Sequence, residues 1–307
     1  MSSQPVPRSS AASKQVGASN PAAERLKLRA FKAAAFVPEP LWQAAARPIA
    51  TWMVRRKPKP VRQWQLNFAI VMGHEPSHAQ TKAAMASWFS NTVISLGLHR
   101  WTANKVANRV EIDPDDVKLL HHLHASQGLV LALPHMGSWD LAGTWASLHG
   151  LPVVSVGENL PAGQFEYFAA MRKRLGYRVL RQYEPNIIDK LVDAVNHGRV
   201  IALVADRDYS RKGVSVNWAT ATGSIAMTLP AGPGLVAQRS GAALVPISLH
   251  FVGDVMHIEL GRVIQPEPEA DGLARMMQAQ ADYFSSQVCE HVIDWHMLQR
   301  FFPGVEA

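Results

Sequence analysis

The stretch Leu129-Val130-Leu131-Ala132-Leu133-Pro134-His135-Met136-Gly137-Ser138-Trp139-Asp140 is an apolar run that stops at a proline and continues into histidine, glycine and serine. The run has the length and composition of a buried strand, and the residues after Ser138 read as a helix. In an open α/β sheet, ligands bind in the crevice at the carboxyl ends of the strands. His135 is expected at that position, which makes it the first candidate for a functional residue.

Short apolar runs and segments of helical length alternate along the rest of the chain. The further apolar runs are 152–156, 178–180, 200–205, 243–251 and 256–264. The helical segments are 138–149, 163–175, 186–197, 226–240 and about 270–290. This alternation predicts an α/β fold with a central mixed, mostly parallel sheet flanked by helices.

The positive charge of the chain is concentrated at its amino end. Residues 1–62 contain twelve Lys and Arg but only two acids, Glu24 and Glu39, so their net charge is +10. The whole chain has a net charge of +7, so the remaining residues are negative in sum. Within 24–57, cations are interleaved with aromatic and aliphatic residues, and prolines interrupt every apolar run before it reaches the length of a spanning helix. The pattern predicts amphipathic helices lying on an anionic membrane; helices packed on the domain with solvated charges are the alternative.

The domain organisation follows from the same composition. Residues 1–22 are rich in Ser, Ala and Pro and are expected to be a disordered tail, with no apolar core of a secretory signal. Residues 23–307 are expected to form a single domain that begins with the basic arm, 23–62. No nucleic-acid-binding motif accompanies this arm, so no nucleic-acid partner is expected. The protein is placed at the cytoplasmic face of the membrane as a peripheral protein.

A metal site is not expected from the sequence. Cys289 is the sole cysteine of the chain, which excludes an internal disulfide. The cluster His121, His122 and His124 fits no standard ligand spacing and reads as a partly exposed helix end.

His135 and Asp140 form a candidate pair for acid–base chemistry. The start of a helix carries partial positive charge, which favours a neutral imidazole. A carboxylate in the first helical turn is positioned to hold one ring nitrogen and to raise the basicity of the other. A histidine five residues before an aspartate also occurs by chance, so this spacing alone leaves the role of the pair open.

The segment from His135 to Asp140 also resembles the H-x4-D/E motif of the bacterial lysophospholipid-type acyltransferases that include the lipid A late acyltransferases. Within that group the chain is similar to the actinobacterial phosphatidylinositol mannoside acyltransferases. The resemblance covers about 25–265. It rests further on the segments 61–67, 158–160, 206–208, 230–233 and 240–246, and on Phe165, Phe168, Arg172, Arg174, Leu175 and Gly176.

The resemblance implies an activity. It implies transfer of a fatty acyl group, palmitoyl, from acyl-CoA to a mannose hydroxyl of a phosphatidylinositol mannoside, with His135 as general base oriented by Asp140. It implies no cofactor beyond acyl-CoA as co-substrate. A lipid A precursor or a lysophospholipid remains an alternative acceptor. A lipid-ester hydrolase using Ser138 is a further alternative, although the chain has no G-x-S-x-G elbow.

Polar residues at other strand ends are candidates for substrate binding. Asp206, Arg207 and Asp208 follow the run 200–205 and are expected to recognise a headgroup or to orient the base; an ion cluster on a turn is the alternative. Glu158 is expected to bond sugar hydroxyls, or else to be an acid at a helix start. Arg172 is expected to face phosphate or the coenzyme A moiety, or else to be solvated. Residues 216–220 depart from the family pattern and are expected to line an acceptor or acyl pocket.

Overall fold

A computed structural model of the chain describes residues 26, 29, 33, 36–158, 163–208 and 213–307. The expected disordered tail, 1–22, lies outside these residues. The amino-terminal part is helical: α2 (Glu39–Arg56), α3 (Lys59–Met72), α4 (His78–Gly97), η1 (Leu98–Arg100) and α5 (Ala103–Ala107). An alternating part follows: β1 (Val110–Ile112), α6 (Pro114–Ser126), β2 (Leu129–Leu133), α7 (Trp139–Leu148), β3 (Val153–Gly157), α8 (Gln164–Arg174), β4 (Arg178–Arg181), α9 (Ile187–Asn196) and β5 (Val200–Val204). The last part contains β6 (Val214–Thr220), β7 (Gly223–Leu229), α10 (Gly232–Ser240), β8 (Ala243–Val252), β9 (Val255–Leu260), α11 (Gly272–Glu290) and η2 (Val292–Asp294).

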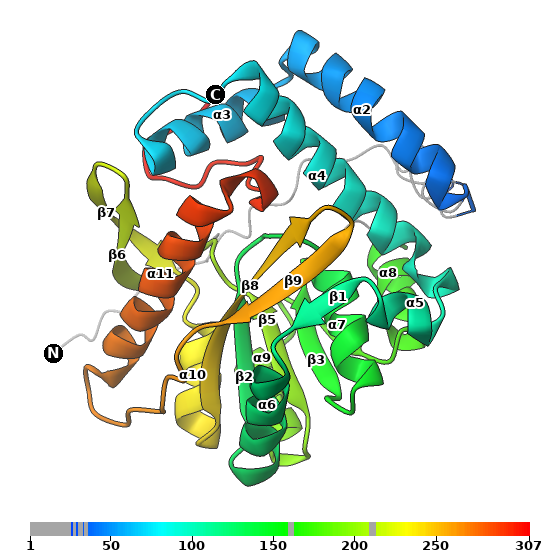
Figure 1. The fold of residues 1–307 in the computed structure, drawn as a ribbon. Coiled ribbons are helices and arrows are strands. Elements are labelled where there is room, and N and C mark those ends of the chain that lie inside the picture. Colours follow the sequence, from blue (N-terminus) through cyan, green and yellow to red (C-terminus); the bar gives the residue numbers. More distant parts are fainter. Residues whose placement is uncertain (1–25, 27–28, 30–32, 34–35, 159–162, 209–212) are drawn as a thin grey trace, which may run out of the picture.

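The central sheet has seven strands in the order β1-β9-β8-β2-β5-β3-β4, between two layers of helices (Figure 1). Neighbouring strands are parallel except for β8 and β9, which are antiparallel. The predicted α/β fold with a mixed, mostly parallel sheet is therefore confirmed. The middle strand is β2, and all five of its residues are buried, as expected for a parallel strand covered on both faces.

The helix expected over 226–240 is wrong in its first half. Residues up to Leu229 form β7, which pairs with β6 as a separate antiparallel hairpin, and α10 begins only after Pro230. The residues of β6 alternate between buried and exposed, which is the period of a strand and not of a helix. Trp218 is fully buried and packs edge-on against Phe301, 4.9 Å between ring centroids. Val216 and Trp218 therefore contribute to the core, and none of the residues 216–220 lines the large cavity described below.

Helix α2 lies along α4, on the side of α4 that faces away from the sheet (Figure 1). One face of α2 is buried, formed by Ala46, Ala50, Met53 and Val54. Leu41 and Trp52, three turns apart on another face, are 61% and 58% exposed. Among the described residues, no helix is long and apolar enough to cross a bilayer. The end of the predicted basic arm, residue 62, falls inside α3.

Candidate active site

His135 and Asp206 leave the sheet side by side. Their strands β2 and β5 are parallel neighbours, with Leu133 opposite Val204 in register. The Nδ1 of His135 lies 2.5 Å from Oδ1 of Asp206, and the His135 backbone N–H donates to Oδ2 at 3.0 Å. Asp206 is fully buried, whereas 27% of the His135 side chain is exposed. The topology of the sheet thus pairs a buried carboxylate with an accessible imidazole.

A segment near the carboxyl end of the chain supports this pair. The indole N–H of Trp295 donates to Oδ2 of Asp206 at 3.1 Å. The backbone N–H of His296 donates to the carbonyl of His135 at 2.7 Å, and the N–H of Gly137 donates to the carbonyl of Asp294 at 3.1 Å. None of these residues was predicted to belong to the site. Their only sequence signal is a Trp-His pair in a short segment after the last helix.

The charge state of Asp206 determines which ring nitrogen of His135 carries the proton. Burial raises the pKa of Asp206, but the adjacent His135 and the hydrogen bonds from His135 and Trp295 outweigh burial and hold the pKa below its usual value. An ionised carboxylate only accepts hydrogen bonds, so the Nδ1 of His135 carries a proton. The Nε2 is then the nitrogen that is left to accept a proton from a substrate.

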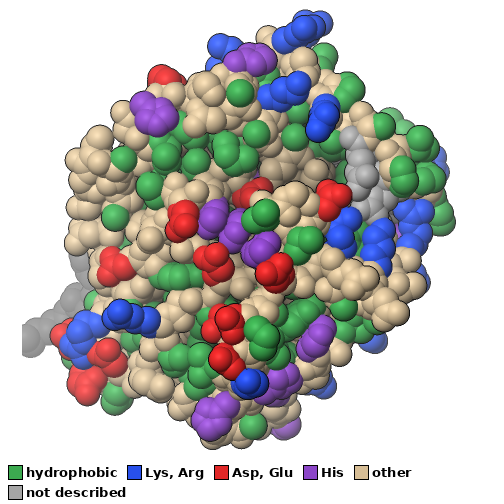
Figure 2. Space-filling view, viewed as in Figure 1, with side chains coloured by type: hydrophobic (Ala, Val, Ile, Leu, Met, Phe, Trp, Pro, Cys, Tyr) green, Lys and Arg blue, Asp and Glu red, His purple; other side chains and the backbone are tan. Residues whose placement is uncertain are grey.

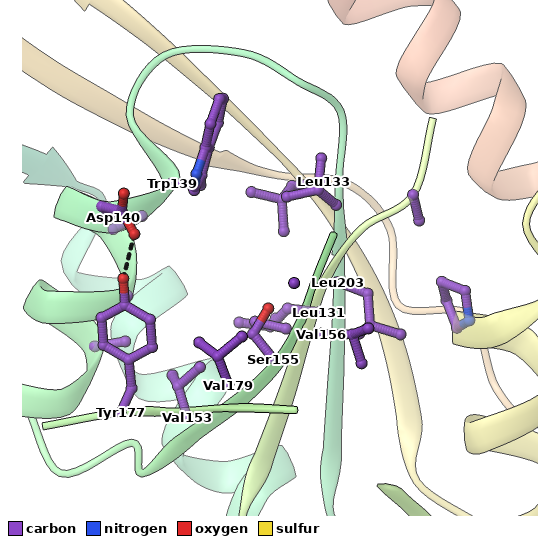
Figure 3. A pocket seen from close by; sticks show the side chains of 18 of the residues that line it. Leu131, Leu133, Trp139, Asp140, Val153, Ser155, Val156, Tyr177, Val179 and Leu203 are labelled. Atoms are coloured by element: carbon purple, nitrogen blue, oxygen red, sulfur yellow. Dashed lines mark hydrogen bonds between the residues drawn. The ribbon is translucent and has the colours of Figure 1, made fainter. Parts of the chain in front are cut away.

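The predicted contact between Asp140 and His135 is wrong. Asp140 is the second residue of α7, and its buried carboxylate turns towards α8 and β4. It accepts from Arg172 Nε at 2.8 Å and Nη2 at 3.3 Å, and from the Tyr177 hydroxyl (Figure 3). Burial raises the pKa of Asp140, but the charge of Arg172 and these hydrogen bonds lower it further than burial raises it. Asp140 thus anchors α7 to α8, while Asp206 holds the imidazole.

The three residues of the segment 206–208 have different surroundings. Asp206 bonds to His135. Arg207 is half-buried, and burial lowers its pKa while the nearby carboxylates of Asp206 and Glu158 raise it. Asp208 accepts from the N–H of Gly213 at 2.8 Å and from the Thr228 hydroxyl at 3.0 Å, which fastens the entrance to the β6–β7 hairpin. Arg172 forms an ion pair with Asp140, and its expected contact with phosphate stays a prediction.

A cavity of about 440 Å³ opens beside His135, a volume typical of a small-molecule site. Leu131, Leu133 and Val153 contribute to its apolar wall, and Trp139 lies over it (Figure 3). Five of the seven predicted site residues line the cavity: His135, Asp140, Glu158, Arg172 and Arg207. The wall is mostly aliphatic and aromatic, so the cavity suits an apolar chain whose polar end lies among these five residues.

Ser138 is not arranged as a nucleophile. It is fully buried, and its Oγ has no hydrogen-bond partner among the described residues. The Nδ1 of His135 bonds to Asp206 and not to Ser138. Activation of a serine requires a base within hydrogen-bond reach of its hydroxyl. The hydrolase alternative therefore has no support in this geometry.

The strand-end imidazole of His135, the buried carboxylate of Asp206 and the adjoining, mostly apolar cavity together form the candidate site. The family model of bacterial lipid A biosynthesis acyltransferases matches residues 20–303, and the chain belongs to that family. This confirms the family resemblance stated from the sequence.

Two sets of relatives give a closer comparison. The chain is 32% identical to the phosphatidylinositol mannoside acyltransferase of Mycolicibacterium smegmatis over 245 residues, which are 77% of this chain and 78% of that protein. It is 35% identical to proteins of the same name from two strains of Mycobacterium tuberculosis over 184 residues, 58% of this chain and 55% of those proteins. The relatives thus have the same name as the subfamily that the sequence resembles.

Proposed function

We propose that the protein is a peripheral membrane acyltransferase that moves a fatty acyl group, palmitoyl, from acyl-CoA to a mannose hydroxyl of a phosphatidylinositol mannoside. The observation that carries this proposal is the His135 imidazole, held by Asp206 at the wall of a mostly apolar cavity. The cavity accommodates the acyl chain, and the imidazole lies beside it. No cofactor takes part other than the coenzyme A of the donor.

The reaction proceeds without a covalent acyl-enzyme, since a thioester is already activated. The Nε2 of His135 removes the proton from the acceptor hydroxyl while the oxygen attacks the thioester carbonyl. Asp206 stabilises the resulting imidazolium through Nδ1. The tetrahedral intermediate expels the coenzyme A thiolate, which takes up the proton from His135. The products are a sugar ester and free coenzyme A thiol, and the histidine returns to its starting state.

The names of the relatives and the polar residues of the cavity support the proposed acceptor. Glu158 and Arg207 line the cavity with His135. A carboxylate accepts hydrogen bonds from sugar hydroxyls, and a guanidinium bonds phosphate oxygens, so the pair matches a phosphoinositol bearing mannose. Asp208 bonds to Gly213 and Thr228 at the entrance to the β6–β7 hairpin. Its contribution to this recognition is to hold that part of the backbone in place.

Membrane attachment is assigned to the basic arm and to α2. Residues 1–62, which include the arm, carry a net charge of +10, and α2 exposes Leu41 and Trp52 as well as Arg55 and Arg56. Interleaved cations and aromatics bind anionic lipid headgroups and the acyl boundary below them. We therefore place the enzyme on the cytoplasmic face of the cell membrane, where its donor is dissolved and its acceptor is embedded.

The test is a comparison of acceptors with palmitoyl-CoA as donor. Purified full-length protein is incubated in parallel with a phosphatidylinositol mannoside, a lysophospholipid and a lipid A precursor, while thiol release and lipid products are followed. Acylation of the mannoside at a much higher kcat/KM than the other two is expected. Preference for another acceptor would overturn the substrate, and thiol release without an acylated lipid would overturn acyl transfer. The Ser138→Ala variant serves as control and is expected to keep the activity of the parent.

A further inference from the structure

Histidine side chains gather in the middle of one face of the molecule, with Asp and Glu side chains around them (Figure 2). The residues that meet there come from three segments. His250 lies on β8, Glu259 and His257 lie on β9, and His291 follows α11 directly. The sequence separates the members by up to 41 positions, which explains why ligand spacing in the sequence predicts no metal site here.

Strand and helix periodicity bring these side chains together. Ser248 and His250 point to the same face of β8, because side chains alternate along a strand. Gln287 and His291 are four residues apart, about one helical turn. The Ser248 hydroxyl donates to Gln287 Oε1 at 2.6 Å, which fixes this register. His250 and His291 therefore stack face to face, with ring centroids 3.7 Å apart and planes 4° apart.

Two ring nitrogens in this cluster have no hydrogen-bond partner among the described residues. They are the Nδ1 of His250, a residue only 6% exposed, and the Nε2 of His291. The Nε2 of His250 faces Glu259 Oε1 at 3.9 Å, too far for a hydrogen bond. Burying polar nitrogens without partners opposes folding, and a bound ion would satisfy them. An imidazole binds a metal through a ring nitrogen that carries no proton, and each of these two rings has a nitrogen without a hydrogen-bond partner among the described residues.

We propose that His250, Glu259 and His291 bind a divalent transition-metal ion, for which Zn²⁺ is the best match. One donor atom from each residue lies within 4.8 Å of the other two. Two imidazole nitrogens and one carboxylate oxygen form a zinc ligand set that leaves one position for water, and Mg²⁺ and Ca²⁺ prefer oxygen donors. Rings that share an ion direct their nitrogens at it, so one of the two stacked rings turns when the metal binds.

The ion would fasten the carboxyl-terminal segment to the β8–β9 hairpin. His291 begins the short stretch that continues through Asp294, Trp295 and His296, whose hydrogen bonds hold the loop of His135 and the carboxylate of Asp206. A metal at this place stabilises the support of the active site and takes no part in the chemistry. Its role is structural and is independent of the identity of the acceptor.

The test measures zinc binding and thermal unfolding of the full-length protein after treatment with a chelator. Calorimetric titration with ZnCl₂ is expected to give one ion per chain. The unfolding temperature is expected to rise by about 5 °C at a hundredfold excess of zinc over its dissociation constant. MgCl₂ is expected to leave the unfolding temperature unchanged. No saturable zinc binding, or an equal response to magnesium, would overturn the site.

Variants assign the ligands. Glu259→Gln and His291→Gln are expected to weaken zinc binding more than about tenfold, since loss of an outer-shell partner alone has an effect of that size. Glu259 is half-buried, with 46% of its side chain exposed, so its variant is expected to fold even if His291→Gln does not. The controls are His257→Gln, a stacked neighbour of His250 outside the ligand set, and His197→Gln on an exposed surface. Zinc affinity that is unchanged in Glu259→Gln, or lost in either control, would contradict the assignment.

Discussion

The proton on Nδ1 of His135 is held by a carboxylate that is buried, ionised and fixed by a second donor, Trp295. Three hydrogen bonds reach Asp206, two from His135 and one from the indole. This arrangement sets both the tautomer and the orientation of the imidazole before any substrate arrives. Asp140 is equally buried, but its charge is balanced by Arg172. Substitution of Asp206 is therefore expected to lower kcat, whereas substitution of Asp140 is expected to lower the free energy of unfolding.

Asp206→Asn is expected to lower kcat by about 10²–10⁴-fold, because an amide favours the wrong tautomer of His135. Asp140→Asn is the matched control, since it removes a second buried aspartate carboxylate, one that lines the cavity but does not bond to His135. It is expected to lower the free energy of unfolding by about 3 kcal/mol, because Arg172 loses its counter-charge. Urea unfolding and initial rates separate the two effects. A larger loss of kcat in folded Asp140→Asn than in Asp206→Asn would contradict the assignment.

His296 makes the stability of the protein depend on pH. Its imidazole is buried between Ser87 and Asn91, and burial lowers its pKa to about 3 from an ordinary 6.5. The unfolded chain thus binds the proton first, and the folded state loses stability as the pH falls from about 6.5 towards 3. Between pH 7 and pH 5 the loss from this group is about 2 kcal/mol. His296→Gln, which keeps a donor towards Ser87, is expected to abolish that difference in urea unfolding; an equal loss in parent and variant would refute it.

At the scale of elements, the loop between β2 and α7 has little freedom. Gly137 has φ of +52°, and a Cβ there would lie 2.7–2.9 Å from Leu249 side-chain and backbone atoms. The loop is also bonded to the carboxyl-terminal segment through Gly137 and His135. The position of His135 therefore depends on a close approach between this loop and β8.

Gly137→Ala is expected to lower the free energy of unfolding by about 3 kcal/mol, from positive φ and steric overlap together. It is also expected to reduce kcat, because His135 lies two residues away. Gly253→Ala is the matched control: its φ is +60°, and no atom lies within 4 Å of an added Cβ. That control is expected to lose about 1 kcal/mol and no activity. Similar unfolding temperatures for the two variants would show that the close approach to Leu249 is unimportant.

The parts of the fold that follow local periodicity were predictable, and those that depend on contacts distant in sequence were not. The run 129–133 and the position of His135 after it are set by composition and by the proline that ends the strand. The partner of His135 depends on which strand lies beside β2, and no local pattern gives strand order. Asp140 was nearer in sequence than Asp206, but helix geometry turns it away. Trp295 reaches Asp206 because the chain returns to the sheet after α11 ends, and no local pattern predicts that contact.

At the scale of the whole molecule, cations and exposed apolar side chains come together at the outer helix. Lys and Arg side chains lie at the upper end and along the right edge of the face drawn in Figure 2, whereas most Asp and Glu side chains lie in its middle and lower parts. Helix α2 ends with Arg55, Arg56 and Lys57, all exposed, and Trp52 lies one turn before them. Such a surface is the kind that the proposed attachment to an anionic bilayer requires, with cations for the headgroups and apolar side chains for the layer beneath them.

Binding to vesicles that contain anionic phospholipid is expected to weaken about 30-fold in the double variant Arg55→Gln/Arg56→Gln, since each cation near an anionic surface contributes about 1 kcal/mol. Trp52→Ala is expected to weaken binding further, and added salt should act on the parent more than on the double variant. Tyr183→Ala, which removes an exposed aromatic residue between β4 and α9, is the control. Flotation of the vesicles gives the bound fraction, and unchanged binding of the variants would place the membrane surface elsewhere.

The measurement that tests the central claim most directly is the rate of palmitoyl transfer to a phosphatidylinositol mannoside by the parent and by His135→Gln. Unfolding curves of both proteins confirm that the variant is folded. If His135 is the base, the variant loses about 10²–10⁴-fold in kcat, the usual contribution of general-base assistance, and keeps its affinity for the lipid. A folded variant that transfers palmitate at the rate of the parent would contradict the account, and the histidine would then be a structural residue at the end of β2.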